Sequence, residues 1–450
     1  MVSQSVSSWG NLIRSSSAVY GLRSRYDAFP AIPVDSTILP YGNGRSYGDS
    51  CLNPGGALLL TRSLDRFIAF DRDAGRITCE AGVLLADILQ LAVPAGWFLA
   101  VVPGTSAVTV GGAIANDVHG KNHHRAGTFG RHVIQFQLLR SDGQRLTCSP
   151  TTNADWFGAT IGGLGLTGLI TYAELQLRRT PGAAMDLEVI RFANLDEFFR
   201  LSEASDQSFE YTVAWVDCLS RGRSLGRGLF QRANHSASPM EHPRIRTGHV
   251  AVPFTAPFSL VNTATLRLFN FLYYHRAGAT RRRRESFQSF FFPLDSVAHW
   301  NRLYGARGFY QYQCVMPGQA GPEMTARLLE RIARSGQGSF LAVLKQFGSL
   351  SSPGMLSFPR CGVTLALDFP NTGARIERLF RELDEIVVAA GGRLYPAKDA
   401  RMPGELFRNT YPRWGELERY VDPVFSSGFW RRVTEGEVVP NGGGHATERA

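Results

Sequence analysis

The sequence predicts an α+β fold of two or three domains, with a ligand that lies across glycine-rich loops. At 450 residues the chain is longer than one ordinary hydrophobic core supports. Between residues 36 and 178, short strand-like runs alternate with glycine-rich turns. One such stretch, 102–133, combines glycines with four histidines and a lysine. Glycine lets the backbone approach a ligand closely, and histidine and lysine supply polar groups beside it.

The first part of this architecture, residues 36–178, is predicted to consist mainly of short strands. The expected strands are 57–61, 76–82, 98–102, 133–140 and 169–177. One stretch, 84–96, has helical spacing and ends at a glycine. Because short strands outnumber helices so clearly, the pattern argues against a doubly wound parallel sheet.

A second α+β domain is predicted over about residues 185–385. Asn194 and Glu197 have the spacing of a capping box at a helix start, and a strand-like run follows at 209–219. Residues 220–290 are expected to be irregular, because glycine, proline and arginine occur throughout. The later elements are expected to be helices at 322–336 and 373–392, and strands at 340–348 and 363–370.

Composition narrows the class of protein. The net charge of +10 favours an anionic partner, although it equally serves solubility. The six cysteines are scattered without a C-x-x-C pair, which argues against a disulfide framework and a zinc site. No apolar run approaches the ~20 residues that span a bilayer. The first residues lack a basic region followed by an apolar run, so we expect no secretory signal peptide.

Two further glycine-rich segments bear on the ligand. Residues 163–168 match G-x-G-x-x-G, but the following run is strand-like, whereas a dinucleotide-binding turn opens a helix. We therefore expect a close-packed turn near the ligand and not an NAD site. The loop 40–49, PYGNGRSYGD, offers consecutive backbone N–H groups and the side chains of Arg45 and Ser46 to an anion. With 102–133, this loop predicts one extended ligand shared by both.

These two loops carry a family resemblance. PYGNGRSYGD (40–49) and PGTSAVTVGGAIANDVHGKNHH (103–124) resemble the FAD-binding loops of the vanillyl-alcohol oxidase/p-cresol methylhydroxylase superfamily, and within it the decaprenylphosphoryl-β-D-ribose 2′-oxidases. Further likeness, such as GFYQYQCVMP (308–317) and GGRLYPAKDARM (391–402), extends from Trp9 to Pro423.

The resemblance implies a two-domain PCMH-type FAD-binding fold with a central substrate domain. The implied divisions are an FAD-binding domain at 1–182, a substrate-binding domain at 183–385, a C-terminal segment at 386–435 that returns to the FAD site, and a disordered tail at 436–450.

The resemblance also implies which residues bind FAD. They are Tyr41, Gly42, Asn43, Gly44, Arg45, Ser46, Tyr47, Gly48, Asp49, Gly104, Thr109, Val110, Gly111, Gly112, Asn116, Asp117, Val118, His119, Ile170 and Tyr395. Relatives that bind flavin covalently carry a histidine in the first loop where this chain has Arg45. The resemblance therefore implies non-covalent FAD.

On the substrate side, the resemblance implies catalytic roles for Lys398, His119, Lys345 and Tyr312. The implied substrate-binding residues are Lys121, Trp215, Tyr312, Val343, Lys345, Phe347 and Lys398. Two positions depart from the pattern: Ala366 replaces a cysteine, and Thr364 replaces an asparagine. The cysteine is not needed for hydride transfer, so the departures bear on the identity of the substrate.

The implied activity is FAD-dependent oxidation of the 2′-hydroxyl of a polyprenylphosphoryl-β-D-ribose to the 2′-keto sugar. The flavin does the redox chemistry, while a lysine of lowered pKa or a neutral histidine takes the hydroxyl proton. A short-chain NAD(P)H-dependent reductase would complete the epimerisation to the arabinose form used in cell-wall arabinan synthesis. Two alternatives stay open: a carbohydrate or polyol oxidase that uses oxygen on a soluble sugar, and a non-catalytic lipid-carrier or membrane-surface binding protein on a flavin fold.

Two clusters remain to be assigned. His123, His124 and His132 lack a zinc-binding spacing, so we expect packing and hydrogen-bonding roles and no metal. The basic run 280–285 follows the apolar-aromatic stretch 266–278. This pair of features predicts a peripheral contact with an anionic membrane, a binding site for a polyprenyl phosphate, or a core helix with a solvated arginine loop. No nucleic-acid-binding module accompanies the charge. We expect a cytoplasmic protein or one peripheral to the inner membrane, with the periplasmic face left open.

Overall fold

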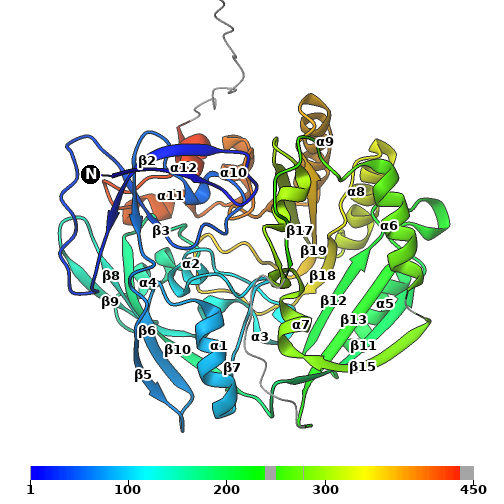
Figure 1. The fold of residues 1–450 in the computed structure, drawn as a ribbon, viewed down its shortest axis with the longest axis horizontal. Helices are drawn as coiled ribbons and strands as arrows, with labels where there is room; N and C mark the ends of the chain where they lie inside the picture. The colour runs from blue at the N-terminus through cyan, green and yellow to red at the C-terminus, as the bar shows by residue number, and fades with distance from the viewer. Residues whose placement is uncertain (1, 239–249, 277, 436–450) are drawn as a thin grey trace, which may run out of the picture.

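The computed structural model describes residues 2–238, 250–276 and 278–435. Figure 1 shows the smaller sheets on one side of the molecule and an eight-stranded sheet with its helices on the other. The α+β class predicted from the sequence is confirmed. The predicted disordered tail, 436–450, lies outside the described residues.

The N-terminal sheet has four strands in the order β1–β2–β4–β3. They are β1 (Val2–Ser7), β2 (Arg14–Gly21), β4 (Ala57–Leu60) and β3 (Ile38–Tyr41). β4 lies between β2 and β3, runs parallel to both, and buries Leu58 and Leu59 completely. β3 leads directly into the first glycine loop, so its pairing with β4 sets the position of that loop.

The second sheet carries the second glycine loop. Its strands are β5 (Phe67–Asp71), β6 (Arg76–Glu80), β10 (Leu169–Arg179), β8 (Val133–Leu139), β9 (Arg145–Cys148) and β7 (Trp97–Leu99), all paired antiparallel. The associated helices are α1 (Leu85–Ala92), α2 (Val110–Ala115), α3 (His123–Ala126) and α4 (Ala154–Thr160). α1 passes into a 3-10 turn that ends at Gly96, where the φ of 80° suits glycine. The predicted strand 98–102 is too long, since pairing ends at Leu99 and the chain then enters the loop.

The third sheet has eight antiparallel strands in the order β15–β11–β13–β12–β18–β19–β17–β20. They are β15 (Thr280–Ser286), β11 (Ala184–Phe192), β13 (Gly228–Ser236), β12 (Tyr211–Val216), β18 (Ala342–Phe347), β19 (Gly362–Pro370), β17 (Phe309–Pro317) and β20 (Arg393–Leu394). The helices α5 (Leu195–Ser205), α8 (Gly321–Ser335) and α9 (Ala374–Ala389) pack on it.

The two faces of this sheet differ in chemistry because side chains alternate along a strand. On the helix-covered face, Leu344, Leu365 and Leu367 are completely buried against α8 and α9. Each such leucine contributes roughly 1.5–3 kcal/mol by burial. The residues between them, such as Lys345 and Thr364, point to the opposite face. This alternation places a row of polar side chains opposite the glycine loops.

The expectation that residues 220–290 are irregular is wrong for the described part of this segment. It forms β13, β14 (Val250–Ala251), α6 (Thr263–His275), β15 and α7 (Phe287–Phe291). The basic run is therefore the edge strand β15 and not a loop. Its arginines alternate opposite acidic residues of β11, with Arg282 facing Glu188 and Arg284 facing Asp186. Cross-strand charge pairing thus overrides the weak strand propensity of the run.

The C-terminal segment joins the sheets. β20 pairs with β17, and α10 (Gly404–Thr410), α11 (Trp414–Leu417) and α12 (Gly428–Thr434) then lie beside the N-terminal sheet (Figure 1). Two backbone hydrogen bonds tie Ile38 of β3 to Val424 and Ser426. The division into domains at 182 and 385 stays a prediction. Within the described ranges, no helix combines the length and the apolar character needed to cross a bilayer.

Candidate active site

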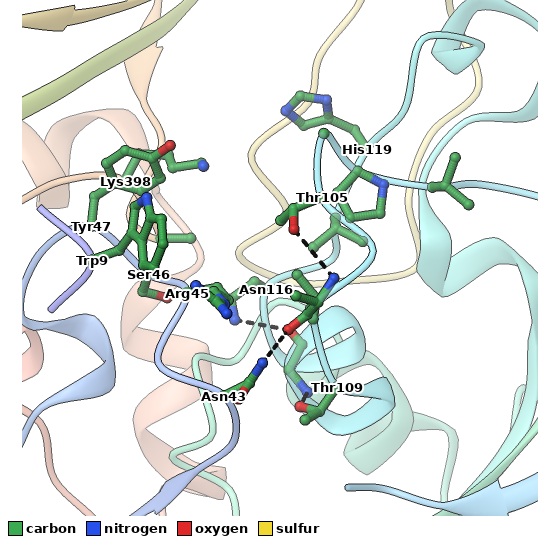
Figure 2. Close-up of a pocket in the computed structure, with 18 of the residues that line it drawn as sticks. Trp9, Asn43, Arg45, Ser46, Tyr47, Thr105, Thr109, Asn116, His119 and Lys398 are labelled. Atoms are coloured by element: carbon green, nitrogen blue, oxygen red, sulfur yellow. Dashed lines mark hydrogen bonds between the residues drawn. The ribbon is translucent and has the colours of Figure 1, made fainter. Parts of the chain in front are cut away.

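A cavity of about 800 Å³ is lined jointly by the two glycine loops and the polar face of the eight-stranded sheet. Figure 2 shows Asn43, Arg45 and Ser46 approaching it from the first loop, and Thr105, Thr109, Asn116 and His119 from the second. The shared ligand predicted for the two loops thus has a single space in which to lie.

The first loop presents donors to this cavity. Asn43 Nδ2 donates to the Ala107 carbonyl at 2.7 Å, which joins the first loop to the second. The Arg45 guanidinium lies over the Trp9 ring, 4.4 Å from its centroid. Two buried polar atoms of cavity-lining residues, Arg45 Nε and Ser50 Oγ, have no hydrogen-bond partner in the protein. Buried donors of this kind indicate a ligand with acceptor oxygens.

The second loop supplies close backbone approach. Thr109 Oγ1 accepts from the Gly112 N–H at 3.1 Å and so caps α2. A Cβ at Gly104 would meet no atom within 4 Å, and one at Gly165 would meet only Pro40, at 3.9 Å. Both glycines line the cavity, so a side chain there would occupy ligand space. The glycine walls and the unpaired donors together fit a flat ligand that carries phosphates.

The remaining wall brings together basic groups from distant parts of the chain. His119 Nε2 lies 3.0 Å from Gln313 Nε2, and His119 Nδ1 lies 3.3 Å from Lys345 Nζ. Lys398 Nζ lies over the Tyr47 ring, 4.0 Å from its centroid. Phe347, Phe358 and Tyr395 surround the imidazole with their rings. The second loop is anchored to this wall by the Thr212 N–H, which donates to the Lys121 carbonyl at 2.9 Å.

Burial shifts the protonation of these groups. Burial, with the charge of Lys398, lowers the pKa of Lys345 to about 7. Burial and the charge of Lys345 lower the pKa of Lys121 to about 7, against the charge of Glu285. Burial and the nearby cations hold the pKa of His119 well below its ordinary value. Burial also lowers the pKa of Lys398, which the Asp368 carboxylate opposes. The wall therefore offers bases that are neutral near pH 7. When its lysines are protonated, it would also stabilise an anionic ligand.

Most of the predicted site residues line the cavity. They are Gly42, Asn43, Gly44, Arg45, Ser46, Tyr47, Gly104, Thr109, Gly111, Gly112, Asn116, Val118, His119, Lys121, Ile170, Trp215, Val343, Lys345, Tyr395 and Lys398. The roles of these residues stay predictions.

The placement of Tyr312 in the cavity is wrong. Its hydroxyl donates to Asp384 Oδ1 at 3.1 Å, and its ring stacks on Phe380 with centroids 5.4 Å apart, beneath α9. Side chains alternate along β17, so Gln311 and Gln313 are the residues that line the cavity. Tyr312 is thus part of the helix-covered core.

Six other predicted residues also lie outside the cavity lining. Asp49 forms a buried ion pair with Arg432 at 2.7 Å, and a Cβ at Gly48 would overlap the Asp399 carbonyl oxygen. Asp117 accepts hydrogen bonds from the Gly130 N–H and the hydroxyls of Ser352 and Ser357, so it ties the second loop to residues 352–357.

Tyr41 lies beneath Gly44, Val110 is fully buried in α2, and Phe347 packs between His119 and His123. These residues pack behind the cavity wall and support it. The sequence prediction included them because they are neighbours in sequence of residues that do line the cavity.

The sequence reasoning missed several lining residues, notably Trp9, Gln311, Gln313 and Asp368. Gln311 Nε2 donates to Asp368 Oδ1 at 2.6 Å. The strict alternation of glutamine with apolar residues in FYQYQCV was the signal for the two glutamines. Nothing local distinguished Trp9, which reaches the cavity from the N-terminal segment.

Of the remaining predicted histidines, His124 and His132 form hydrogen bonds with backbone carbonyls, whereas the two buried ring nitrogens of His123 have no partner in the protein. His124 Nε2 lies 3.1 Å from the Phe209 carbonyl, and His132 Nε2 lies 2.9 Å from the Ala126 carbonyl. The His123 ring packs on Phe347 with centroids 4.3 Å apart. Among the described residues, no cluster of three potential ligands could hold a metal ion.

The turn at 163–168 contributes Gly165 and Gly168 to the cavity lining and leads into β10. It thus precedes a strand, as predicted, and not a helix.

Comparison with known proteins now decides the family. A sequence model described as an FAD binding domain matches residues 35–149. Decaprenylphosphoryl-β-D-ribose oxidase of Mycolicibacterium smegmatis is 37% identical over 411 residues, which cover 88% of this chain and 89% of that protein. The chain belongs to the decaprenylphosphoryl-β-D-ribose oxidase family. It is an FAD-dependent oxidoreductase, and the predicted resemblance and cofactor are confirmed.

Two other relatives match the chain over different lengths. An uncharacterised protein of Streptomyces coelicolor is 36% identical over 372 residues, covering 78% of this chain and all of that protein. Mouse L-gulonolactone oxidase is 33% identical over 138 residues, about 30% of each chain.

Proposed function

We propose that this protein oxidises the 2′-hydroxyl of a polyprenylphosphoryl-β-D-ribose to the 2′-keto sugar. One observation carries the proposal: a single cavity joins the two glycine loops to the cluster formed by His119, Lys345 and Lys398. A cofactor loop and a set of buried bases therefore share one space. The likeness to the M. smegmatis oxidase supports the choice of substrate.

The first and second loops hold FAD in this proposal. Arg45 Nε and Ser50 Oγ are the unpaired donors that face its acceptor oxygens, and Gly104 and Gly165 leave it room. FAD supplies the acceptor for the hydride that leaves the sugar. Arg45 stands where covalently flavinylated relatives carry a histidine, so binding is non-covalent.

The wall formed by His119, Lys345 and Lys398 accepts the substrate proton and supplies a positive charge. Oxidation of an alcohol requires a group that takes the hydroxyl proton, and a buried amine or imidazole that is neutral near pH 7 can do so. Lys345 and His119 meet that condition. Lys398 has Asp368 as a counter-charge, which favours its ammonium form as a fixed positive charge in the cavity.

The lipid-linked substrate enters beside an apolar wall. Trp215 and Val343 line the cavity on the eight-stranded sheet, and Trp215 contacts the ring of Tyr273 in α6 with centroids 4.7 Å apart. Ala366 also lines the cavity and leaves a smaller side chain where the family pattern has a cysteine. We infer that sugar or lipid preference differs at this wall.

A peripheral membrane contact belongs to the same proposal. Leu268, Phe271 and Leu272 of α6 are more than half exposed, as are Phe254 and Phe258 before it. An exposed apolar patch of this kind fits the interfacial region of a bilayer, where a polyprenyl substrate resides. Three arginines of β15 form ion pairs with acidic residues: Arg282 with Glu188, Arg283 with Glu285 and Arg284 with Asp186. Insertion of the apolar side chains therefore contributes more to membrane binding than the charge of β15.

The proposed product defines a partner by its chemistry. A 2′-keto sugar becomes the 2′-epimer only when a hydride is added to the opposite face. A short-chain NAD(P)H-dependent reductase is the expected consumer, and the epimer is the arabinose donor for cell-wall arabinan.

Anaerobic flavin reduction tests the function. Polyprenylphosphoryl-β-D-ribose added to the holoenzyme without oxygen is expected to bleach the flavin absorbance, while free ribose and alditols at equal concentration leave it unchanged. Bleaching by free sugars alone would replace the proposal with a soluble carbohydrate oxidase. A protein whose flavin no sugar reduces would be a binding protein on this fold.

A further inference from the structure

A hydrogen-bonded chain of four side chains crosses the cavity wall. Thr364 of β19 contacts Gln313 of β17, Gln313 contacts His119, and His119 contacts Lys345 of β18. All four residues line the cavity. The donor and the acceptor of each hydrogen bond can be assigned in turn from the Thr364 end. Thr364 contacts a backbone carbonyl, and a carbonyl can only accept.

The chain begins at Thr364. Its Oγ1 donates its one proton to the Cys314 carbonyl at 2.8 Å. The hydroxyl can therefore only accept from Gln313, whose Nε2 lies 3.4 Å away. A flipped amide would instead point its carbonyl oxygen at an oxygen lone pair. Thr364 thus fixes the amide nitrogen of Gln313 toward the cavity.

The next bond sets the tautomer of the imidazole. The second N–H of the Gln313 amide faces His119 Nε2 at 3.0 Å, so Nε2 must accept. A neutral imidazole that accepts at Nε2 carries its proton at Nδ1. That proton points at Lys345 Nζ, 3.3 Å away. An ammonium has no lone pair to receive it, whereas a neutral amine has one.

We propose that Gln313, anchored by Thr364, is a positioning residue that holds His119 in its Nδ1–H tautomer and thereby presents Lys345 as the neutral amine that accepts the hydroxyl proton. This inference rests on the proposed oxidation of a sugar hydroxyl. The Lys345 amine releases the hydrogen bond from His119 Nδ1–H and turns its one lone pair to the substrate. The substrate O–H bond then breaks, and its proton forms a new N–H bond with that lone pair. The O–H electron pair becomes the second carbonyl bond, as the carbinol hydrogen leaves with its own pair as the hydride that FAD accepts.

The electrostatic surroundings favour the same assignment. The titratable groups that act on or beside Lys345 are His119 and Lys121 from the second loop, His123 from α3 and Lys398 from the segment after β20. All of them are cationic when protonated, so each disfavours an ammonium at Lys345. Its other hydrogen bond goes to the Gly120 carbonyl at 3.4 Å, which either form of the lysine can donate.

Histidine NMR tests the tautomer without any substrate. In long-range ¹H–¹⁵N spectra of the histidine-labelled holoenzyme at neutral pH, we expect the His119 signals, assigned by their loss in His119→Gln, to show Nδ1–H. Gln313→Leu is expected to release the ring to the Nε2–H form or a mixture, and Thr364→Val to do so in part. Thr364→Ser keeps the hydroxyl and the wild-type pattern. Nε2–H in the wild type, or an unchanged pattern in Gln313→Leu, would overturn the inference.

Gln311→Leu is the matched control for the NMR experiment. It removes an amide from the same strand and the same face, but Gln311 bonds Asp368 and not His119. We expect the His119 tautomer to be unchanged. A tautomer shift equal to that of Gln313→Leu would show a general effect of the wall and would contradict the specific role.

The pH profile of anaerobic flavin reduction gives the second readout. Reduction should rise with pH as Lys345 loses its proton, with an apparent pKa near 7. In Gln313→Leu the freed Nδ1 can accept from the ammonium, so this limb should move up by about one pH unit, which corresponds to about 1.4 kcal/mol. An unmoved limb would contradict the inference. If no polyprenylphosphoryl sugar reduces the flavin, the proposed function fails, while the NMR result still decides the tautomer.

Discussion

Lys398 and Lys345 are both buried lysines of the cavity wall, but their neighbours differ. Asp368 offers Lys398 a carboxylate, and Lys398 Nζ also lies over the Tyr47 ring. The groups found to act on Lys345 are cationic or neutral. Two lysines in one cavity can thus do different work, one as a fixed charge and one as a base. Such divergent environments are a common way to separate roles among like residues.

We predict that Lys398→Met slows anaerobic flavin reduction by roughly 10²-fold, the size of effect seen when one preorganised charge is removed from an active site. The measurement is stopped-flow bleaching of the flavin absorbance at saturating substrate. Lys398→Arg should recover part of the rate, because it restores the charge. Equal loss in both variants would argue for a role in proton transfer instead.

Gly48 illustrates a residue that the family pattern placed at the cofactor but that packs against protein. A Cβ at this position would overlap the Asp399 carbonyl oxygen, a backbone atom that cannot move alone. We predict that Gly48→Ala destabilises the protein by about 1–3 kcal/mol through overpacking. Urea unfolding followed by tryptophan fluorescence measures this change.

Gly415→Ala provides the comparison for Gly48→Ala. A Cβ at Gly415 meets no atom within 4 Å, and the residue lies in α11. The same substitution there should be neutral or slightly stabilising. Similar losses of unfolding free energy in both variants would mean that the backbone freedom of glycine, and not the contact with Asp399, causes the destabilisation.

At the scale of elements, α12 is locked to the first glycine loop by a buried charge cluster. Arg432 lies 2.7 Å from Asp49 and 3.0 Å from Asp399, and all three side chains are nearly inaccessible to solvent. The arginine also donates to the Met402 carbonyl. Arg432 is therefore one of the side chains through which the C-terminal segment supports the cofactor loop.

We predict that Arg432→Met costs about 3–5 kcal/mol of unfolding free energy, because it leaves two carboxylates buried without a counter-charge. It should also weaken FAD retention, measured by the flavin-to-protein absorbance ratio after dialysis. Arg413→Met, which removes a half-exposed pair with Glu416, should cost less than about 1 kcal/mol. A small loss at Arg432 would show that the cluster is not needed to hold the loop.

The elements also show where pattern reasoning works. Helices α8 and α9 and strands β18 and β19 were predicted close to their observed bounds, because each buries one face and its periodicity records that face. The strand β15 was missed because its four arginines gain strand structure from pairing with β11, which no local pattern contains. Tyr312 was misplaced because neighbouring residues of β17 point to opposite faces, and Tyr312 takes the helix-covered face.

At the scale of the whole molecule, more than half of the exposed large apolar side chains among the described residues lie on one stretch of the chain, from Val250 to Leu272. Leu268, Phe271 and Leu272 belong to α6, whose other face packs on Trp215 at the cavity wall. A membrane contact through α6 would therefore bring the cavity close to a lipid-linked substrate.

We predict that the holoenzyme co-sediments with vesicles that contain anionic lipid, and that Leu268→Ser/Phe271→Ser/Leu272→Ser reduces the bound fraction at least about tenfold, since each buried apolar side chain contributes over 1 kcal/mol. Because the neighbouring arginines are ion-paired, added salt should weaken binding only modestly. Val34→Ser, at a 90% exposed site in the N-terminal part of the chain, should bind like the wild type. Loss of binding in high salt alone would assign the contact to charge.

Local sequence determined the two glycine loops, the class of ligand that they accept and most of the strands and helices. Glycine conformations and side-chain periodicity depend on residues that are close in sequence, so they can be predicted from the sequence alone. Only the tertiary structure decided which face each residue takes and which distant groups meet. His119, Gln313, Lys345 and Lys398 come together because antiparallel register and chain return place them on one wall. The alternation along β17 marks Gln313 as a residue of the polar face, but strand pairing sets the register, so only the folded molecule shows that Gln313 meets His119.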